Sequence, residues 1–313
     1  MSDWRPASSA EVASVRAAML ARARQYFADH EILAVDTPAL GPSAPTDPHI
    51  ASMSVGAADL FLHTSPEFHM KRLLADGYPD IYSICRVFRD GESGRHHLPE
   101  FTMIEWYRHS MSLDEIIVDT SNLIAVVLER PELATGVSSR DYSGVFADGV
   151  GIDPFAASIG ELADAATADA QLRTSLGDDR DAWLDLIMAT KIAPQFGRNS
   201  LSVVKHYPAS QAALARVCPA DPRVADRFEM FYGELELANG YVELRDPQEL
   251  ERRMDDDLGV RRSHGLPAVP RDEQLLAALR AGLPECAGVA MGFERLHMAA
   301  ADTDDIRNIV SFA

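Results

Sequence analysis

The sequence predicts an α+β fold, and two kinds of segment carry this prediction. Residues 81–107 and 228–244 are rich in β-branched and aromatic side chains, with Gly, Pro and Asn residues between the runs, as in strands joined by turns. Residues 9–30 and 110–130 instead repeat apolar side chains at the spacing of an amphipathic helix. With 313 residues, the chain can bury a large core as one domain or as one domain with an insertion.

Composition narrows the class of protein. We expect no membrane partner, because no apolar run is long enough to span a bilayer and residues 1–6 do not resemble a secretory signal. Three cysteines without metal-site spacing (Cys85, Cys218, Cys286) fit reduced thiols and a cytoplasmic location. The net charge is −19, whereas nucleic-acid binders normally carry a basic excess. This argues against tRNA as the main partner, although a local patch could still bind RNA.

The chain is expected to open with a helix and a short strand. Ser8 or Ser9 begins the helix of 9–30, and 32–38 follow as a strand that ends at a proline. Residues 41–54, rich in Gly, Pro, Ser and Asp, predict a loop. The apolar stripe of the helix contains Val12, Val15, Met19 and Phe27.

Residues 63–74 have the features of a helix start. Ser65 is a good N-cap, Pro66 suits the first helical position, and Glu67 complements the helix dipole. These roles explain the three residues without any binding function, although capping and binding can coexist.

The densest group of functional side chains lies in 86–108. We expect strands at 81–89 and 101–107, joined by a charged loop over 90–99. An aromatic ring, a carboxylate and a phenol on one strand face, beside a loop-proximal arginine, suit a nucleotide and an ammonium group better than a core. A surface hairpin with scattered charges is the alternative. The residues that share this face are Phe101, Met103, Glu105 and Tyr107, and the arginine is Arg89.

Helices are expected next. An apolar face runs along 110–130, and 132–200 are rich in Ala and Asp with Gly and Pro breaks, which predicts short helices forming an insertion. The apolar face consists of Leu113, Ile116, Ile117, Leu123, Ile124 and Val127.

Three glutamates recur every seven residues in the strand-like segment 228–244: Glu229, Glu236 and Glu243. Asn239–Gly240 is a strong hairpin signal, so solvated glutamates on a hairpin are one reading. Against it, Glu236 lies in a run of leucine and alanine that looks largely buried.

The last marked segment, 286–300, predicts a strand followed by a helix. Small residues at Gly288, Ala290 and Gly292 would let a ligand approach the strand backbone, and the helix that starts near Phe293 carries Arg295. Cys286 reads as a small buried residue.

Residues 86–108 closely resemble motif 2 of the class II aminoacyl-tRNA synthetases, in the form found in lysyl-tRNA synthetases and their short paralogues. The helix and strand of 9–38 resemble motif 1, and 286–300 resemble motif 3 in the right order. The resemblance extends from about residue 9 to 313. It implies a class II catalytic core, mostly an antiparallel sheet flanked by helices, as a single domain over 1–313 without an anticodon-binding domain. It also implies a homodimer.

The resemblance assigns roles residue by residue. Arg89 and Arg295 are the catalytic arginines, Phe101 stacks on adenine, and Mg²⁺ is held by Glu229 and Glu236. Glu243 would receive the distal ammonium of the substrate, with Tyr107 as its partner. The implied ATP-binding residues are Arg89, Asp90, Gly91, Glu92, His97, Leu98, Phe101, Glu236, Leu237, Gly292 and Arg295. The implied substrate-binding residues are Ser65, Glu67, Glu105, Tyr107, Asn239, Glu243 and Ala290.

Within this family the chain is most similar to the elongation factor P–(R)-β-lysine ligases, short paralogues that also carry Glu-Trp-Tyr-Arg, here at 105–108. Ala290 replaces the glycine of lysyl-tRNA synthetases, and one methyl in a tight pocket shifts substrate preference by about 1–3 kcal/mol. The resemblance therefore implies ATP-dependent activation of (R)-β-lysine, or lysine, as an adenylate, followed by transfer to a lysine of elongation factor P.

Two departures from the family pattern keep alternatives open. Gly91 displaces the motif 2 glutamate to Glu92, and Leu98 replaces an asparagine near the nucleotide. Leu98 cannot form a hydrogen bond through its side chain. The alternatives are a free-standing class II ligase acting on tRNA or a small molecule, and a non-catalytic paralogue that senses amino acids.

Overall fold

The computed structural model describes residues 4–56 and 60–313 and confirms the α+β class. Within these residues the main sheet has eight strands in the order β1-β5-β6-β11-β10-β9-β8-β7. The two edge pairs, β1 with β5 and β7 with β8, are parallel, and the other pairs are antiparallel. The strands are β1 (Leu33–Ala34), β5 (Ile81–Phe88), β6 (Glu100–His109), β7 (Ser138–Asp141), β8 (Leu201–Lys205), β9 (Arg227–Tyr232), β10 (Leu235–Val242) and β11 (Cys286–Gly292). A second sheet, in the order β2-β4-β3, contains β2 (Leu40–Gly41), β3 (Ser54–Val55) and β4 (Leu60–Leu62).

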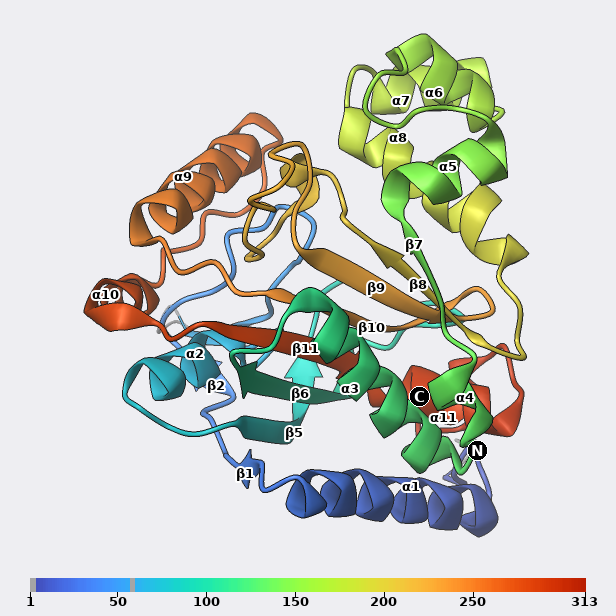
Figure 1. Ribbon diagram of the computed structural model, residues 1–313, viewed down its shortest axis with the longest axis vertical. Helices are drawn as coiled ribbons and strands as arrows, with labels where there is room; N and C mark the ends of the chain where they lie inside the picture. The colour runs from blue at the N-terminus through green and yellow to red at the C-terminus, as the bar shows by residue number, and fades with distance from the viewer. Residues whose placement is uncertain (1–3, 57–59) are drawn as a thin grey trace.

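Helices cover both faces of the main sheet (Figure 1). In the described part of the chain, no helix has the length and apolar character needed to cross a membrane. The helices are α1 (Ala10–Asp29), α2 (Glu67–Ala75), α3 (Leu113–Leu128), α4 (Glu132–Thr135), α5 (Tyr142–Val150), α6 (Ile159–Ala165), α7 (Ala170–Leu176), α8 (Arg180–Ile187), α9 (Pro247–Ser263), α10 (Glu273–Gly282) and α11 (Phe293–Ala301). A π-helical turn, η1 (Met188–Ile192), continues α8.

Strand alternation separates the two sides of the sheet. Helices α1, α3 and α11 pack on the face that carries Tyr82, Trp106 and Val289. Helices α2, α9 and α10 pack on the opposite face, where Tyr107 and Cys286 are buried. Because successive side chains point to opposite faces, polar side chains at alternate positions on β6 and β10 lie on the face covered by α2, with small residues of β11 between them.

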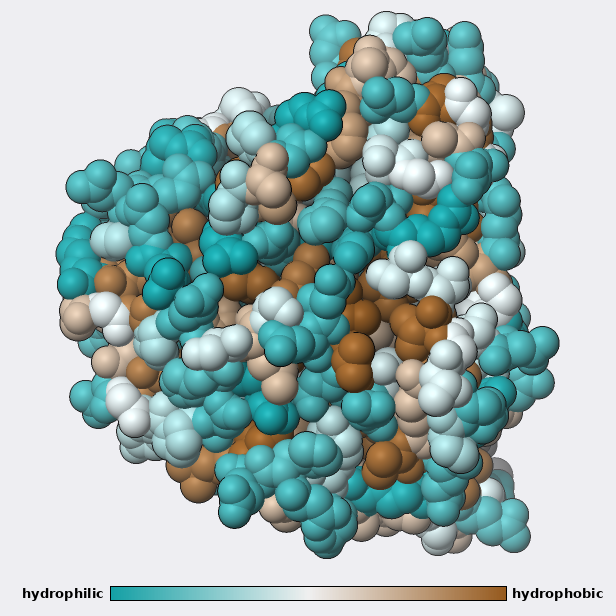
Figure 2. Space-filling view, viewed as in Figure 1, coloured by the Kyte–Doolittle hydropathy of each residue, from teal (hydrophilic) through white to brown (hydrophobic). Residues whose placement is uncertain are grey.

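Helices α5–α8 form a lobe that projects from the sheet (Figures 1 and 2). The lobe has its own core around Tyr142, Phe146 and Trp183, and Phe231 of β9 packs into that core. Helices thus dominate the region of 132–200, and its interpretation as an insertion remains a prediction. In the view of Figure 2 the surface is mostly hydrophilic, in keeping with the net charge of −19.

The helix predictions were correct in outline. The Ser9 hydroxyl caps α1, accepting a hydrogen bond from the backbone of Val12 over 3.4 Å. Val15 was wrongly placed on the apolar stripe: it is 47% exposed, and the buried side of α1 is shifted around the helix to Met19, Ala23, Tyr26 and Phe27. All six apolar positions predicted for α3 are buried.

Asn239–Gly240 does not form the hairpin turn that its local preference suggests. The chain turns at Gly233–Glu234, and Gly240 lies inside β10. A Cβ at Gly240 would lie 2.6 Å from Phe228 Cε1 and 2.8 Å from Val289 Cγ2. Glycine is therefore required here by close packing between strands, and tertiary contacts override the turn preference. The predicted strand of 32–38 is also shorter, with only β1 paired in the sheet.

Candidate active site

Three carboxylates meet between α2 and the sheet, and we call this group the acidic pocket: Glu67, Glu105 and Glu243. Glu105 of β6 and Glu243, just after β10, are 2% and 1% exposed. Lys71 of α2 lies 2.7 Å from a Glu67 oxygen and 2.6 Å from a Glu243 oxygen. The acidic pocket thus joins α2 to the sheet through one buried ammonium group.

Hydroxyl groups complete the acidic pocket. Ser65 donates to one oxygen of Glu105 over 2.6 Å, and Tyr107 donates to the other over 2.7 Å. The Ser65 oxygen also accepts from the backbone of Glu67 over 3.0 Å, but α2 begins at Glu67 with Pro66 as its N-cap, so the predictions of Ser65 as N-cap and Pro66 as first helical residue were each wrong by one position. Tyr241 donates to Glu67. Ser65 therefore both supports the helix start and orients a buried carboxylate.

The acidic pocket contains three carboxyl groups and one ammonium group. Burial, reinforced by the charge of Glu67, raises the pKa of Glu105 to about 8. Burial also raises the pKa of Glu243 to about 8, although Lys71 opposes this shift. Burial lowers the pKa of Lys71, but the two carboxylates outweigh it and the net shift is upward. Three carboxylates around one ammonium group favour binding of a further cation.

Tyr107 and Gly288 differ in detail from their expected roles. Tyr107 donates to Glu105, and no described hydrogen bond joins it to its predicted partner Glu243. Gly288 faces Tyr107 across the β6–β11 pair. A Cβ there would lie 2.4 Å from Tyr107 Cε1 and 2.5 Å from Glu243 Oε1. The space beside Gly288 is therefore filled by pocket side chains, whereas we expected it to admit the ligand.

Arg89 lies just before the charged loop of residues 90–99, which we call the motif 2 loop. The Arg89 guanidinium carbon lies 5.1 Å from the ring centre of Phe101, and Arg89 Nη1 lies 3.5 Å from Oε1 of Glu92. Gly91 has φ +74°, a conformation that suits glycine, which explains the residue at this turn. Among the described residues, nothing accepts a hydrogen bond from the buried Nε of Arg89. A buried cationic donor without an acceptor is suited to a phosphate.

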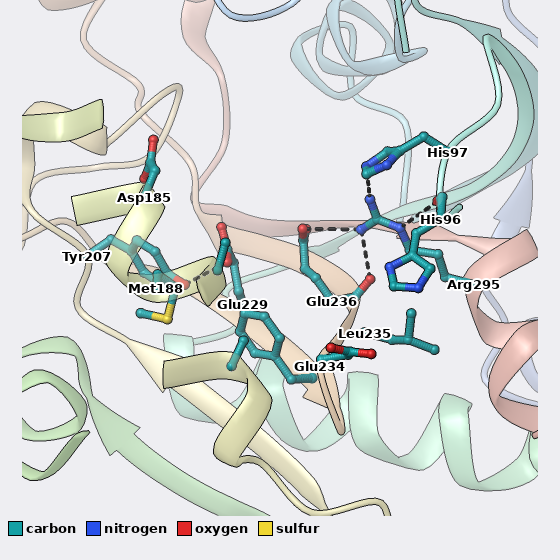
Figure 3. Close-up of a pocket in the computed structure, with 13 residues that line it drawn as sticks. His96, His97, Asp185, Met188, Tyr207, Glu229, Glu234, Leu235, Glu236 and Arg295 are labelled. Atoms are coloured by element: carbon teal, nitrogen blue, oxygen red, sulfur yellow. Dashed lines mark hydrogen bonds and ion pairs between the residues drawn. The ribbon is translucent and has the colours of Figure 1, made fainter. Parts of the chain in front are cut away.

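A cavity of about 450 Å³ lies beside this loop, between the sheet and α8 (Figure 3). Arg295 of α11 binds the Glu236 side chain over 3.2 Å and its carbonyl over 3.0 Å. The other end of the guanidinium lies 2.5 Å from His97 Nε2. The lining residues are His96, His97, Asp185, Met188, Ala189, Ala193, Tyr207, Glu229, Phe231, Glu234, Leu235, Glu236 and Arg295.

Glu229 and Glu236 project into the cavity from neighbouring strands (Figure 3). Glu229 accepts from Tyr207 over 2.6 Å and pairs with Arg227 over 2.6 Å. Burial and the charge of Glu236 raise the pKa of Glu229 to about 7. Two carboxylates that repel each other at the edge of a cavity fit Mg²⁺, which prefers oxygen ligands. The structure thus brings together the pair that was predicted to hold this ion.

Several predicted residues do not line this cavity. The Leu98 side chain packs against the main core and lines a separate, smaller pocket, and Leu237 is 1% exposed. Asn239 accepts from Arg227 over 3.2 Å. Ala290 lies opposite Glu105 in the β6–β11 pair, at the edge of the acidic pocket. Gly292 caps the start of α11, and Asp90 bonds to the loop backbone at Ala51.

Other residues of the site were missed from the sequence. Lys71 could have been found from Glu67, since residues four apart on a helix are neighbours. Arg227 precedes Glu229 by two positions and so shares its strand face. Asp185 and Tyr207 reach the cavity from segments distant in sequence, and no local signal identifies them.

Comparison with known proteins agrees with this geometry. A family model described as tRNA synthetases class II (D, K and N) matches residues 1–313. Two relatives named elongation factor P–(R)-β-lysine ligase, from Sodalis glossinidius and Histophilus somni, are each 41% identical and cover 99% of this chain and 97% of their own length. A third, from Haemophilus influenzae, is 40% identical over 100% of this chain and 98% of its own. The chain therefore belongs to the class II tRNA synthetase family, in the branch of these ligases.

Proposed function

We propose that this chain is an ATP-dependent ligase that activates (R)-β-lysine, or lysine, as an aminoacyl-adenylate and transfers it to a lysine side chain of elongation factor P. The names of its relatives support the substrate and the acceptor protein. The observation that carries the proposal is the acidic pocket, where one buried ammonium group pairs with two carboxylates and a third, Glu105, is held by Ser65 and Tyr107 instead. A substrate with two amino groups would favour the ionised form of these carboxyl groups and balance their charge.

The first step joins the substrate carboxylate to the α-phosphate of ATP, as a carboxylate oxygen–phosphorus bond forms and the bond to pyrophosphate breaks. Arg89, with its unpaired Nε, would offset charge on the carboxylate and α-phosphate. Arg295 would offset charge on the leaving pyrophosphate, and Phe101 would stack on adenine. Catalysis of this kind depends on positioning and electrostatics rather than on a nucleophilic side chain.

Mg²⁺ belongs to the proposal, with Glu229 and Glu236 as its ligands. A bound ion would add positive charge beside the phosphates. Arg295 shares Glu236 with that ion, so one carboxylate would orient both positive groups. A homodimer and a cytoplasmic location are proposed from the family resemblance and from the cysteine pattern.

The second step distinguishes a protein ligase from a synthetase acting on tRNA. The amine of the acceptor lysine attacks the carbonyl carbon of the adenylate, and AMP leaves. Labelled (R)-β-lysine, ATP and Mg²⁺ should therefore give label on elongation factor P and none on tRNA, with Arg89→Ala as the inactive control. Label on tRNA alone would support the free-standing synthetase, and adenylate without transfer to either acceptor would point to a small-molecule acceptor.

A further inference from the structure

The acidic pocket, which we propose binds the ammonium groups of the substrate, already contains an ammonium group of the protein, that of Lys71. Lys71 is 2% exposed and lies on α2, one helical turn after Glu67. Its Nζ is 2.7 Å from Glu67 and 2.6 Å from Glu243, and it lies 5.5 Å from the ring centre of Tyr241. The side chain is thus enclosed by the groups that the proposed function assigns to substrate.

Burying a lysine is costly unless its charge is balanced, and here two carboxylates balance it. The same contacts bind the carboxylates in turn. Glu67 belongs to α2, whereas Glu243 follows β10, so the ammonium group is the only described ion pair that joins the two. The hydroxyl of Tyr241 on β10 also bonds to Glu67, as a neutral link beside this ionic one. The ammonium group therefore takes part in setting the separation of the two carboxylates, and with it the separation of any two cations that they bind.

Resting on the proposed function, we propose that Lys71 is a positioning residue of the acidic pocket. Lys71 helps to fix the spacing of Glu67 and Glu243, and the pocket thereby selects substrates by the spacing of their two amino groups. Lys71 does not touch the reacting carboxylate in this account. It acts through the two glutamates, with the third carboxylate, Glu105, held separately by Ser65 and Tyr107.

A purely structural role for Lys71 would have different consequences. If it only stabilised the packing of α2, its loss would lower stability and leave the affinity of the folded protein for amino acid unchanged. A positioning role predicts a change in amino-acid KM, in its pH dependence and in the ratio of substrates. It also predicts little change in the KM for ATP, because the ion pairs of Lys71 in the described structure are with Glu67 and Glu243, whereas Arg89 pairs with Glu92 and Arg295 with Glu236.

The experiment compares Lys71→Met, Lys71→Arg and the wild-type protein in ATP–pyrophosphate exchange with (R)-β-lysine and α-lysine, with Lys205→Met as control. Lys205 pairs with Asp114 at the surface, far from the acidic pocket. For Lys71→Met we expect the amino-acid KM to rise about tenfold or more and the KM for ATP to change by less than about twofold, as expected when one partner of a buried pair is lost. For Lys71→Arg we expect partial rescue of KM and an altered substrate ratio, since a planar fork cannot reproduce a point charge.

The pH profile is the second readout. Removing the ammonium group disfavours ionised Glu243, so the rise of kcat/KM for amino acid with pH should move to higher pH. The groups that face Glu243 and share this titration are Glu67 and Lys71 on α2, Glu105 and Tyr107 on β6, Tyr241 on β10 and Cys286 on β11.

Three results would overturn the inference or its basis. Folded Lys71→Met with wild-type KM and pH profile contradicts the positioning role and leaves the proposed function intact. If Lys71→Met does not fold, an unchanged substrate ratio in Lys71→Arg contradicts it equally. Wild-type protein that neither exchanges pyrophosphate nor binds either amino acid in calorimetry contradicts the proposed function itself.

Discussion

Gly288→Ala should damage the acidic pocket while leaving the phosphate site intact. The added Cβ would lie 2.4 Å from Tyr107 Cε1, 2.5 Å from Glu243 Oε1 and 2.7 Å from Tyr107 Cδ1. Tyr107 is held by Glu105 through its hydroxyl, and Glu243 is held by Lys71 through its other oxygen, so both side chains are restrained. Overpacking of this kind costs about 1–3 kcal/mol. If the pocket absorbs that strain, the KM for amino acid rises by about 5- to 150-fold, since 1.4 kcal/mol is a factor of ten.

The matched control is Gly240→Ala in the neighbouring strand. Its Cβ would lie 2.6 Å from Phe228 Cε1, 2.8 Å from Val289 Cγ2 and 2.9 Å from the Gly288 carbonyl oxygen, so the strain is similar but both side-chain contacts lie on the opposite face of the sheet. Both variants should unfold at lower temperature, measured by circular dichroism. Only Gly288→Ala should raise the amino-acid KM in ATP–pyrophosphate exchange. Equal KM values for the two folded variants would refute the placement of the pocket.

Four further predictions concern Arg295, Ala290 and the buried carboxyl groups. Arg295→Ala should lower the kcat of exchange by about 100-fold or more, as loss of a preorganised charge does. The control Arg95→Ala removes an exposed arginine of the motif 2 loop and should leave kcat unchanged. Equal rates for the two variants would contradict the role of Arg295 at the pyrophosphate. Ala290→Gly should shift the kcat/KM ratio towards α-lysine by about 1–3 kcal/mol, and an unchanged ratio would remove Ala290 from the specificity account. The amino-acid KM should fall as pH rises from 6 to 8, because the carboxylates whose pKa is raised to about 8 must ionise to bind an ammonium group. Without amino acid, the free energy of unfolding should fall as pH rises from 4.5 through about 8. In the unfolded chain these carboxyl groups have a pKa of 4.5 and lose their protons first, which favours unfolding. A free energy of unfolding that stays constant over this range in chemical denaturation would contradict the raised pKa values.

Much of the site was predictable because its residues lie on regular strands. Alternation along β6 places Phe101, Glu105 and Tyr107 on one face of the sheet. Arg89 follows β5 and Arg295 follows β11, and both of these strands pair with β6. The structure brings Glu105 and Tyr107 to the acidic pocket and Arg295 to the cavity, whereas Arg89 and Phe101 contact each other and are not among the residues that line the cavity.

The rest depended on packing that no local pattern encodes. Asn239–Gly240 is a strong turn signal, yet Gly240 is needed inside a strand where Phe228 and Val289 leave no room for a side chain. Lys71 has the appearance of a solvated helix residue, and only the approach of Glu243 from β10 gives it a buried partner. Asp185 reaches the cavity because a whole lobe packs on β9.

The most direct test of the central claim is ATP–pyrophosphate exchange by the wild-type protein with (R)-β-lysine, α-lysine and a panel of other amino acids. We expect exchange that is fastest with (R)-β-lysine, which would establish adenylate formation and show that Gly91 and Leu98 are tolerated in the motif 2 loop. Folded protein that exchanges pyrophosphate with no amino acid would contradict the ligase and favour a paralogue that binds amino acids without activating them.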